Sequence, residues 1–359
     1  MKTIEKEFFL QTDYPIDRLG ADQPLFIDIE TTGLSSERSK VYLVGCLFPH
    51  TNECWGFRQW LTESPLEERL LLERVIAFCR DFSCLIHFNG SRFDLPFLHK
   101  RSEKLGLKDS FLTMDGLDLY QNIKKCKNLC GLTNVKQKSV EQFLNIERDD
   151  QYGGGELIPI YHQFVKTGNP KLLELLLLHN EEDVLGMLQI LPMLCYFDLK
   201  SGAAASGLPT VEEESDTELF LRFPLELRLP QPVSFHTEDW YGIAKRDSLR
   251  LKIPLRTGEL RYYFPNYKDY YYLPAEDTAV HKSVAVYVDP KFRVKAKPEN
   301  CYTKKSGLFL PVPEKISLPP DRPAFQELPQ GPRYVAYEKT LFEDSAFWKN
   351  YLCALIQKI

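Results

Sequence analysis

The sequence has 359 residues, enough for two domains at roughly 150 residues each. Hydrophobic residues make up 43% and charged residues 26%, which argues against extensive disorder, and no apolar run approaches the roughly 20 residues of a membrane span. The net charge of −5 hides an imbalance: residues 1–219 hold 23 basic and 34 acidic residues (−11), and residues 220–359 hold 22 and 16 (+6). Because the nine cysteines are scattered and the N-terminus lacks a signal-peptide core, we expect a cytoplasmic protein with no membrane partner.

Residues 1–199 alternate between strand and helix patterns. Short β-branched and aromatic runs predict five strands, at 25–29, 41–48, 54–60, 85–88 and a stretch ending at Leu117. Helical spacing predicts helices that begin at Ser64-Pro65, run over 95–105, and run over 171–196 with a bend or break at Pro192. Three adjacent strands followed by strand–helix alternation predict an α/β fold, a mixed five-stranded sheet flanked by helices.

The remaining sequence reads as a linker and a smaller β-rich domain. Residues 200–219 combine a Gly/Ala/Ser tract with an acidic segment, which predicts a linker. Within 220–359, strict alternation predicts strands at 248–253 and 283–288. Seven prolines between Pro311 and Pro332 favour an extended segment, and the apolar face of 344–359 predicts a terminal helix docked on its own domain.

Four acidic positions are candidates for a metal site. Asp28 and Glu30 are two apart in a predicted strand, so both carboxylates point to one side. Asp94 begins a predicted helix, and Asp183 lies four residues after His179 on one helical face. Grouped carboxylates suit Mg²⁺ or Mn²⁺. Taken singly, each has an ordinary structural explanation: a solvated edge strand, a helix N-cap, and the polar side of a helix.

In order and spacing, three motifs resemble the DEDD (DnaQ-like) superfamily of 3′–5′ exonucleases, which have a ribonuclease H-like fold. The motifs are Asp28–Leu34, Asn89–Asp94 and His179–Asp183. Over residues 23–195 the chain looks most like the YprB-type predicted nucleases, whose helix motif His-Asn-x-x-Asp follows an Ile-Pro-x-x-Tyr segment, here Ile158–Tyr161.

The resemblance implies two-metal hydrolysis of phosphodiester bonds. Asp28 would bridge two Mg²⁺ or Mn²⁺ ions, Glu30 and Asp183 would complete the site of the ion that activates water, and Asp94 would bind directly or through water. His179 would be the general base that takes a proton from the attacking water, or would only hydrogen-bond a ligand carboxylate or phosphate. One departure from the family pattern concerns His179. Three residues separate it from Asp183, which is the spacing that a related branch uses for tyrosine.

The resemblance also implies contacts to the terminal nucleotide. The Thr31 backbone and Leu34, acting as a wedge, are expected to hold the last base, with Asn89 near the 3′ end.

The Gly153–Gly155 run could mimic a phosphate loop, but it lacks the Lys-Ser/Thr of a P-loop and is interpreted as a flexible loop.

The C-terminal half is rich in aromatic and basic residues. Seven aromatic residues occur in 262–272, and 282–305 holds seven basic and two acidic residues. Aromatic platforms beside a basic track bind single-stranded nucleic acid, but tyrosines packing a small β domain explain the same pattern. On the first interpretation Lys291, Arg293, Lys295 and Lys297 line the substrate's route.

The sequence thus predicts a metal-dependent 3′–5′ exonuclease acting on single-stranded DNA or RNA ends. The alternative is a weakly active or inactive nucleic-acid-binding or scaffold protein that retains the fold. Retention of all four acidic positions favours the enzyme, because clustered carboxylates without a cation serve no structural purpose.

Overall fold

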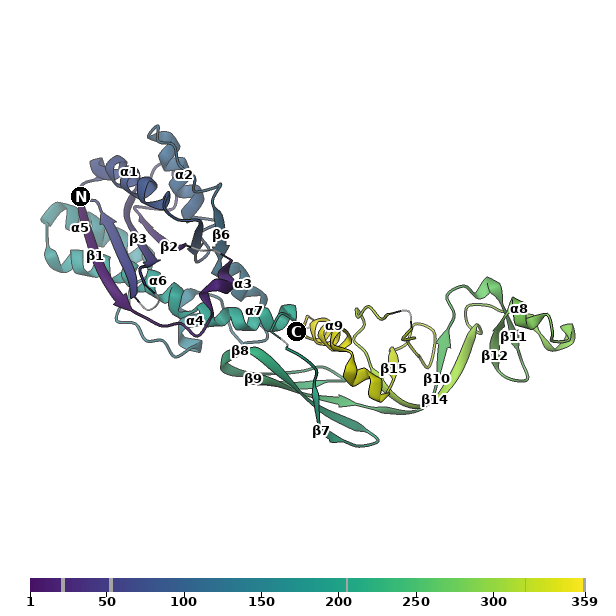
Figure 1. The fold of residues 1–359 in the computed structure, drawn as a ribbon. Coiled ribbons are helices and arrows are strands. Elements are labelled where there is room, and N and C mark those ends of the chain that lie inside the picture. The colour runs from purple at the N-terminus through teal and green to yellow at the C-terminus, as the bar shows by residue number, and fades with distance from the viewer. Residues whose placement is uncertain (21–22, 52–53, 205, 320, 358–359) are drawn as a thin grey trace. The chain divides into compact units, whose positions relative to one another are not determined.

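The computed structural model describes residues 1–20, 23–51, 54–204, 206–319 and 321–357. The chain divides into two compact units, Met1–Phe197 and Asp198–Ile359 (Figure 1). Positions 205, 320 and 358–359, which fall in the predicted linker, proline-rich segment and terminal helix, lie outside the described residues.

The first unit is built on a mixed six-stranded sheet. Its strands, in the order β1-β4-β3-β2-β5-β6, are β1 (Lys2–Phe9), β4 (Cys54–Leu61), β3 (Val41–Pro49), β2 (Pro24–Thr31), β5 (Cys84–His87) and β6 (Asp115–Asp118). β2 is antiparallel to β3 and parallel to β5, and β5 is parallel to β6. The predicted mixed sheet is confirmed, with β1 as a sixth strand. β1 pairs along its whole length with β4, but most of its side chains are exposed, so no buried face marks it in the sequence.

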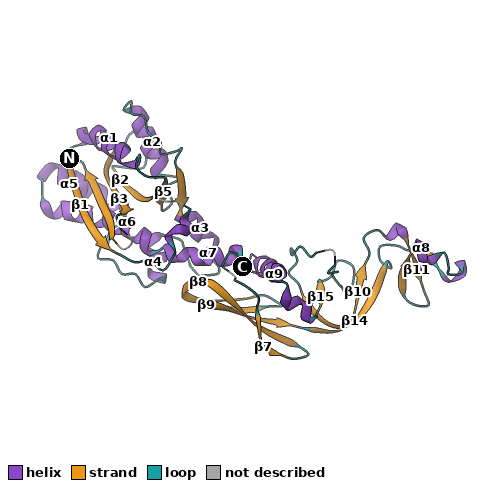
Figure 2. Cartoon of the chain, in the orientation of Figure 1, coloured by secondary structure: helices purple, strands orange, loops and turns teal. Residues whose placement is uncertain are grey.

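Helices cover both faces of this sheet (Figure 2). On one face α1 (Glu68–Cys79) and α2 (Asp94–Lys104) pack on Ile27 and Ile29 of β2. On the other, α5 (Gly154–Thr167) and α6 (Pro170–Gln189) pack on Tyr42 and Leu43 of β3. The shorter helices are α3 (Leu119–Lys125) and α4 (Gln137–Phe143). β2 is therefore a central strand, one side in an apolar core and the other under α6.

Two predicted helix boundaries are confirmed. Ser64 and Glu67 form a capping box before a 3₁₀ turn and α1. Pro192 lies in a 3₁₀ turn (Leu191–Met193) that separates α6 from α7 (Leu194–Ser201), because proline cannot donate the backbone hydrogen bond of a helix interior. The stretch Pro170–Ser201 is long and apolar enough to cross a membrane, but 67% of its most apolar window is buried within the protein, as in a core helix.

The described residues of the second unit form three small sheets. They are β7-β8-β9 (Thr210–Glu214, Glu218–His236, Tyr241–Pro254), β10-β14-β15 (Arg256–Tyr263, Tyr302–Pro311, Tyr334–Ala336) and β12-β11-β13 (Thr278–His281, Tyr270–Leu273, Val294–Lys295). These sheets confirm the predicted β-rich character, and the predicted strand at 248–253 lies within β9. α9 (Ser345–Ile356) buries the predicted apolar face, and Tyr351 Oη accepts from Trp240 Nε1 (2.6 Å) and donates to the Pro311 carbonyl (2.7 Å).

Two predictions for this unit need correction. The predicted linker 200–219 contains β7, which pairs antiparallel with β8. All five β7 residues are exposed, so backbone pairing rather than burial forms this strand. The predicted strand 283–288 is instead α8 (Lys282–Ala285) and a turn. Val284 and Val286 are 56% and 62% exposed, so their alternation does not mark a buried strand face.

Candidate active site

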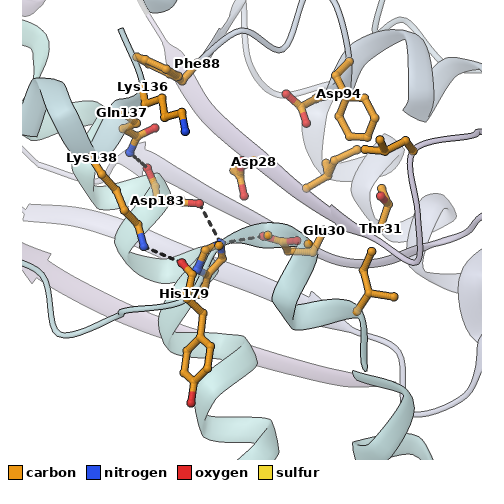
Figure 3. A pocket seen from close by; sticks show the side chains of 18 of the residues that line it. Asp28, Glu30, Thr31, Phe88, Asp94, Lys136, Gln137, Lys138, His179 and Asp183 are labelled. Carbon is orange, nitrogen blue, oxygen red and sulfur yellow. Dashed lines mark hydrogen bonds and ion pairs between the residues drawn. The ribbon is translucent and has the colours of Figure 1, made fainter. Parts of the chain in front are cut away.

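The acidic residues of β2, α2 and α6 converge on one cleft of about 580 Å³ in the first unit. Asp28, Glu30, Asp94, His179 and Asp183 all line it (Figure 3). They come from three segments far apart in the sequence, which the order of strands around β2 brings together. Lys136 and Lys138, at the start of α4, line the same cleft.

β2 fixes the first two carboxylates. Asp28 and Glu30 lie opposite Gly45 and Leu43 of β3, whereas Ile29 between them lies in the apolar core. The pairing shifts register between Glu30 and Thr31, and such irregularities commonly re-aim side chains next to active sites. Because β2 pairs with β3 at both positions and Ile29 between them is buried in the core, the backbone holds the two carboxylates on one side of the strand.

Close packing of α6 on β3 brings the helix to these carboxylates. A Cβ on Gly45 would lie 2.1 Å from Asn180 Oδ1 and 3.0 Å from Val184 Cγ2, so only glycine leaves room for the helix here. Asn180 is fully buried; its Nδ2 donates to Asp28 Oδ2 (2.8 Å) and its Oδ1 accepts from Gln59 Nε2 (2.8 Å). Asn180 therefore holds one oxygen of Asp28 in place.

His179 bridges two of the carboxylates. Its Nε2 lies 3.2 Å from Glu30 Oε1 and 3.2 Å from Asp183 Oδ2, and ligand atoms of these three residues lie within 4.8 Å of one another. His179 and Asp183, four residues apart, share a helical face. The three-residue gap that departs from the better-known pattern thus still brings the imidazole to the site.

Asp94 occupies the first turn of α2. The N-cap position is Phe93, and no side-chain cap bond forms there, so the side chain of Asp94 lines the cleft instead. A Cβ on Gly90 would lie 2.8 Å from Asp94 Oδ2, so this glycine makes room for the carboxylate. Asp118 holds the preceding turn by accepting from the Asn89 backbone N–H (2.9 Å).

A loop between α4 and α5 adds two charged residues that the sequence analysis missed. Arg148 forms an ion pair with Asp183 and also lies near Glu141 and Glu182. Asp150 Oδ2 lies 2.8 Å from His179 Nδ1. Neither residue belongs to a helix, a strand or a recognised motif, so only the tertiary structure shows their proximity. The sequence signal nearest to this part of the site was the His-Asn pair of the third motif, which includes Asn180.

The Gly153–Gly155 run also differs from its prediction as a flexible loop. Gly153 is the N-cap of α5 and Gly154 begins the helix. The Gly153 N–H donates to Glu156 Oε2 (2.8 Å). All three glycines line the cleft, and a Cβ on Gly154 would lie 3.8 Å from Glu30 Oε2, so the first turn of α5 forms part of the cleft wall.

The electrostatics show an excess of negative charge. Burial, followed by repulsion from Asp183, Asp94 and Glu30, raises the pKa of Asp28 well above its usual range. Burial and repulsion from Glu30 raise the pKa of Asp94 to about 7. Burial lowers the pKa of His179, but its hydrogen bonds to Asp183 and Glu30 outweigh this and raise it to about 11. The imidazolium thus supplies positive charge between two carboxylates.

This donor set fits a divalent cation. Carboxylate oxygens are hard ligands of the kind that Mg²⁺ and Mn²⁺ prefer. Arg148 does not balance the cluster, because it is shared among Glu141, Glu182 and Asp183. The raised pKa values of Asp28 and Asp94 show that their ionised forms lack a compensating positive charge, which a bound cation would supply.

The residues predicted to bind substrate fall into two groups. Thr31 and Leu34 line the cleft, and Leu34 is 87% exposed. Asn89 is not among the described residues that line the cleft; its φ of +63° places it in the turn before Asp94, a conformation that asparagine tolerates.

The four basic candidates, Lys291, Arg293, Lys295 and Lys297, belong to the second unit. Lys291 lies 3.7 Å from Asp289, and the Arg293 guanidinium lies over the Tyr271 ring and donates to the Ala285 carbonyl. Lys295 and Lys297 are exposed, and no side-chain ion pair is found for either within the described residues.

Several tyrosines of the aromatic segment 262–272 pack within the second unit. The Tyr270 ring stacks on Phe264 with centroids 4.3 Å apart. The Tyr272 and Tyr302 hydroxyls donate to Asp277 Oδ1 (2.6 and 2.5 Å). Of the two interpretations of this segment, these contacts favour packing over base stacking.

Comparisons with known proteins place the first unit among ribonuclease H-like folds. Residues 25–195 match the family described as the RNase_H superfamily. The uncharacterized protein YprB of Bacillus subtilis (strain 168) is 28% identical over 171 residues, 46% of this chain and 40% of that protein, so the match spans less than half of the relative. The family match over residues 25–195 supports a nuclease function for the first unit.

Two solved structures are also similar, at low scores. The family B DNA polymerase from the archaeon Pyrobaculum calidifontis has a TM-score of 0.42 and 14% identity, covering 94% of this chain and 45% of that one. Exonuclease I has a TM-score of 0.30 and 14% identity, covering 56% and 55%. The fold assignment rests on the family match over residues 25–195 and not on these scores.

Proposed function

We propose that the first unit is a metal-dependent 3′–5′ exonuclease that hydrolyses phosphodiester bonds at single-stranded nucleic acid ends. The observation that carries this proposal is the convergence of Asp28, Glu30, Asp94 and Asp183, with His179, on one cleft. A ribonuclease H-like fold with four carboxylates at one opening is suited to cleaving a polyanion only when cations offset their charge.

Asp28, Glu30, Asp94 and Asp183 would hold two Mg²⁺ or Mn²⁺ ions. When bound, the ions would stabilise the charge that develops on the attacking and leaving oxygens. The side chains contribute position: β2 fixes Asp28 and Glu30, Asn180 holds Asp28 Oδ2, and Arg148 pairs with Asp183.

His179 Nε2 would accept the proton of the attacking water. Nε2 is the imidazole nitrogen that faces Glu30 and Asp183, whereas Nδ1 faces Asp150. An imidazole is a suitable base near neutral pH once the two carboxylates no longer hold its second proton.

The substrate end would lie against Thr31 and Leu34. Leu34 lines the cleft and exposes most of its side chain, so it is available to pack against a terminal base. Lys136, also exposed at the cleft, would offset part of the repulsion between the acidic site and phosphate.

The decisive test is hydrolysis of end-labelled oligonucleotides, DNA and RNA, single- and double-stranded, with Mg²⁺ or Mn²⁺. We expect stepwise shortening of single strands from the 3′ end, and none with EDTA or with Asp28→Asn. Internal cleavage would refute the exonuclease assignment. Tight binding without hydrolysis by the full chain would instead favour a nucleic-acid-binding protein.

A further inference from the structure

The loop residue Asp150 is held more tightly than a surface turn requires. Its side chain is only 2% exposed. Oδ1 accepts from the Tyr152 backbone N–H (3.1 Å), and Oδ2 contacts both Lys138 Nζ (2.9 Å) and His179 Nδ1 (2.8 Å). Both carboxylate oxygens are therefore occupied, and the carboxylate has one fixed orientation.

The backbone around Asp150 is anchored to the same helix that carries His179. The N–H groups of Asp149 and Asp150 donate to the two carboxylate oxygens of Glu182 (2.9 Å each). Arg148 pairs with Asp183 on that helix. The loop thus moves with α6, and the distance between Asp150 and His179 does not depend on a flexible segment.

We propose that Asp150 is the positioning residue of His179. An ionised carboxylate accepts hydrogen bonds but donates none, so the atom of His179 that faces Asp150 must be Nδ1–H. In the neutral ring this leaves the lone pair on Nε2, the atom that faces Glu30 and Asp183. Asp150 thus fixes both the orientation and the tautomer that a general base needs.

Asparagine at position 150 cannot reproduce this arrangement. With its oxygen toward His179 and Lys138, its NH₂ group faces the donor Tyr152 N–H. With its oxygen toward Tyr152, the NH₂ group faces Lys138 and donates to Nδ1, which moves the ring proton to Nε2. The first rotamer keeps Nδ1–H but offers it only a neutral acceptor and leaves the Tyr152 N–H unpaired, and the second rotamer favours the other tautomer. Asp149→Asn is the matched control, because the Asp149 side chain is exposed in the same loop.

The kinetic test rests on the proposed function. We expect Asp150→Asn to lower kcat about 10–100-fold with little change in KM, and Asp149→Asn to leave both unchanged. In the His179→Ala background, Asp150→Asn should cause no further loss, because a residue that acts through His179 has nothing left to position. An additive loss in the double variant would overturn the proposal.

A second readout needs no catalysis. In protein labelled with ¹⁵N-histidine and loaded with Mg²⁺, the His179 ring should carry its proton on Nδ1, and Asp150→Asn should shift the signals toward the other tautomer. A wild-type ring protonated on Nε2 alone overturns the proposal even if the variant does not fold. If the wild type hydrolyses nothing, the proposed function fails, while the nitrogen shifts still decide whether Asp150 orients His179.

Discussion

Gly45 of β3 controls how closely α6 approaches the carboxylates of β2, so Gly45→Ala should disturb the site without touching a catalytic group. The added Cβ would lie 2.1 Å from Asn180 Oδ1, 2.9 Å from Asn180 Cγ and 3.0 Å from Val184 Cγ2, against ordinary contacts of 3.4–4 Å. Asn180 is fully buried and bonded to Gln59 and Asp28, so it cannot rotate away freely. The helix must therefore shift by about 1 Å.

The cost has two parts. Overpacking of a core typically destabilises by about 1–3 kcal/mol, and a displacement of about 1 Å at a catalytic group can cost about 10²-fold in rate. We expect Gly45→Ala to lower the free energy of unfolding, measured in urea, by about 1–3 kcal/mol. We also expect it to lower kcat about 10–100-fold. The matched control is Gly116→Ala in β6, whose added Cβ would meet nothing closer than 3.4 Å. If the two variants have equal stability and turnover, Gly45 does not set the approach of α6.

Three further predictions concern charge. Asp28→Asn or Asp183→Asn should abolish hydrolysis and weaken Mn²⁺ binding in calorimetry; retained turnover in either variant would remove that residue from the site. Since the pKa of Asp94 is raised to about 7, its contribution to stability is present at acid pH and is lost as pH rises through 7. In EDTA, Tm should fall by about 5–10 °C between pH 5 and 8, and Asp94→Asn should flatten that fall; an equal fall in the variant would contradict this origin. Changing both Lys295 and Lys297 to Glu should weaken the binding of a single-stranded oligonucleotide, measured by fluorescence anisotropy. The slope of the logarithm of the binding constant against the logarithm of the salt concentration should fall by about 2. An unchanged slope would exclude both lysines from the substrate's route.

Periodicity accounts for what the sequence could predict of the site. Residues two apart on a strand share a face, which groups Asp28 with Glu30, and residues four apart on a helix share a face, which groups His179 with Asp183. The structure brings these pairs together as that reasoning expects. Both pairs lie in regular elements, where local geometry alone fixes the direction of a side chain.

The rest of the site depends on tertiary packing that leaves no local signal. Arg148 and Asp150 lie in an irregular loop, and their partners are about 30 residues away in sequence. In the sequence, Gly45 is only a glycine within a predicted strand, where glycine is unfavourable. Its role becomes clear only from the structure, in which Asn180 packs directly against it. For the same reason β7 was missed: it forms by edge pairing, with no buried residue to mark it.

The geometry of β2 explains why the cleft calls for a cation. A pair of repelling carboxylates at a surface would separate, but Asp28 and Glu30 lie on a strand that is paired with β3 at both positions and anchored through Ile27 and Ile29 in the core. Protons, the His179 bridge or a bound cation can relieve their repulsion. A divalent cation brings more charge than an imidazolium, so its binding would leave Glu30 less able to hold the proton of His179. Without a cation, His179 Nε2 bridges Glu30 and Asp183. The same nitrogen would become available as a base when a cation binds.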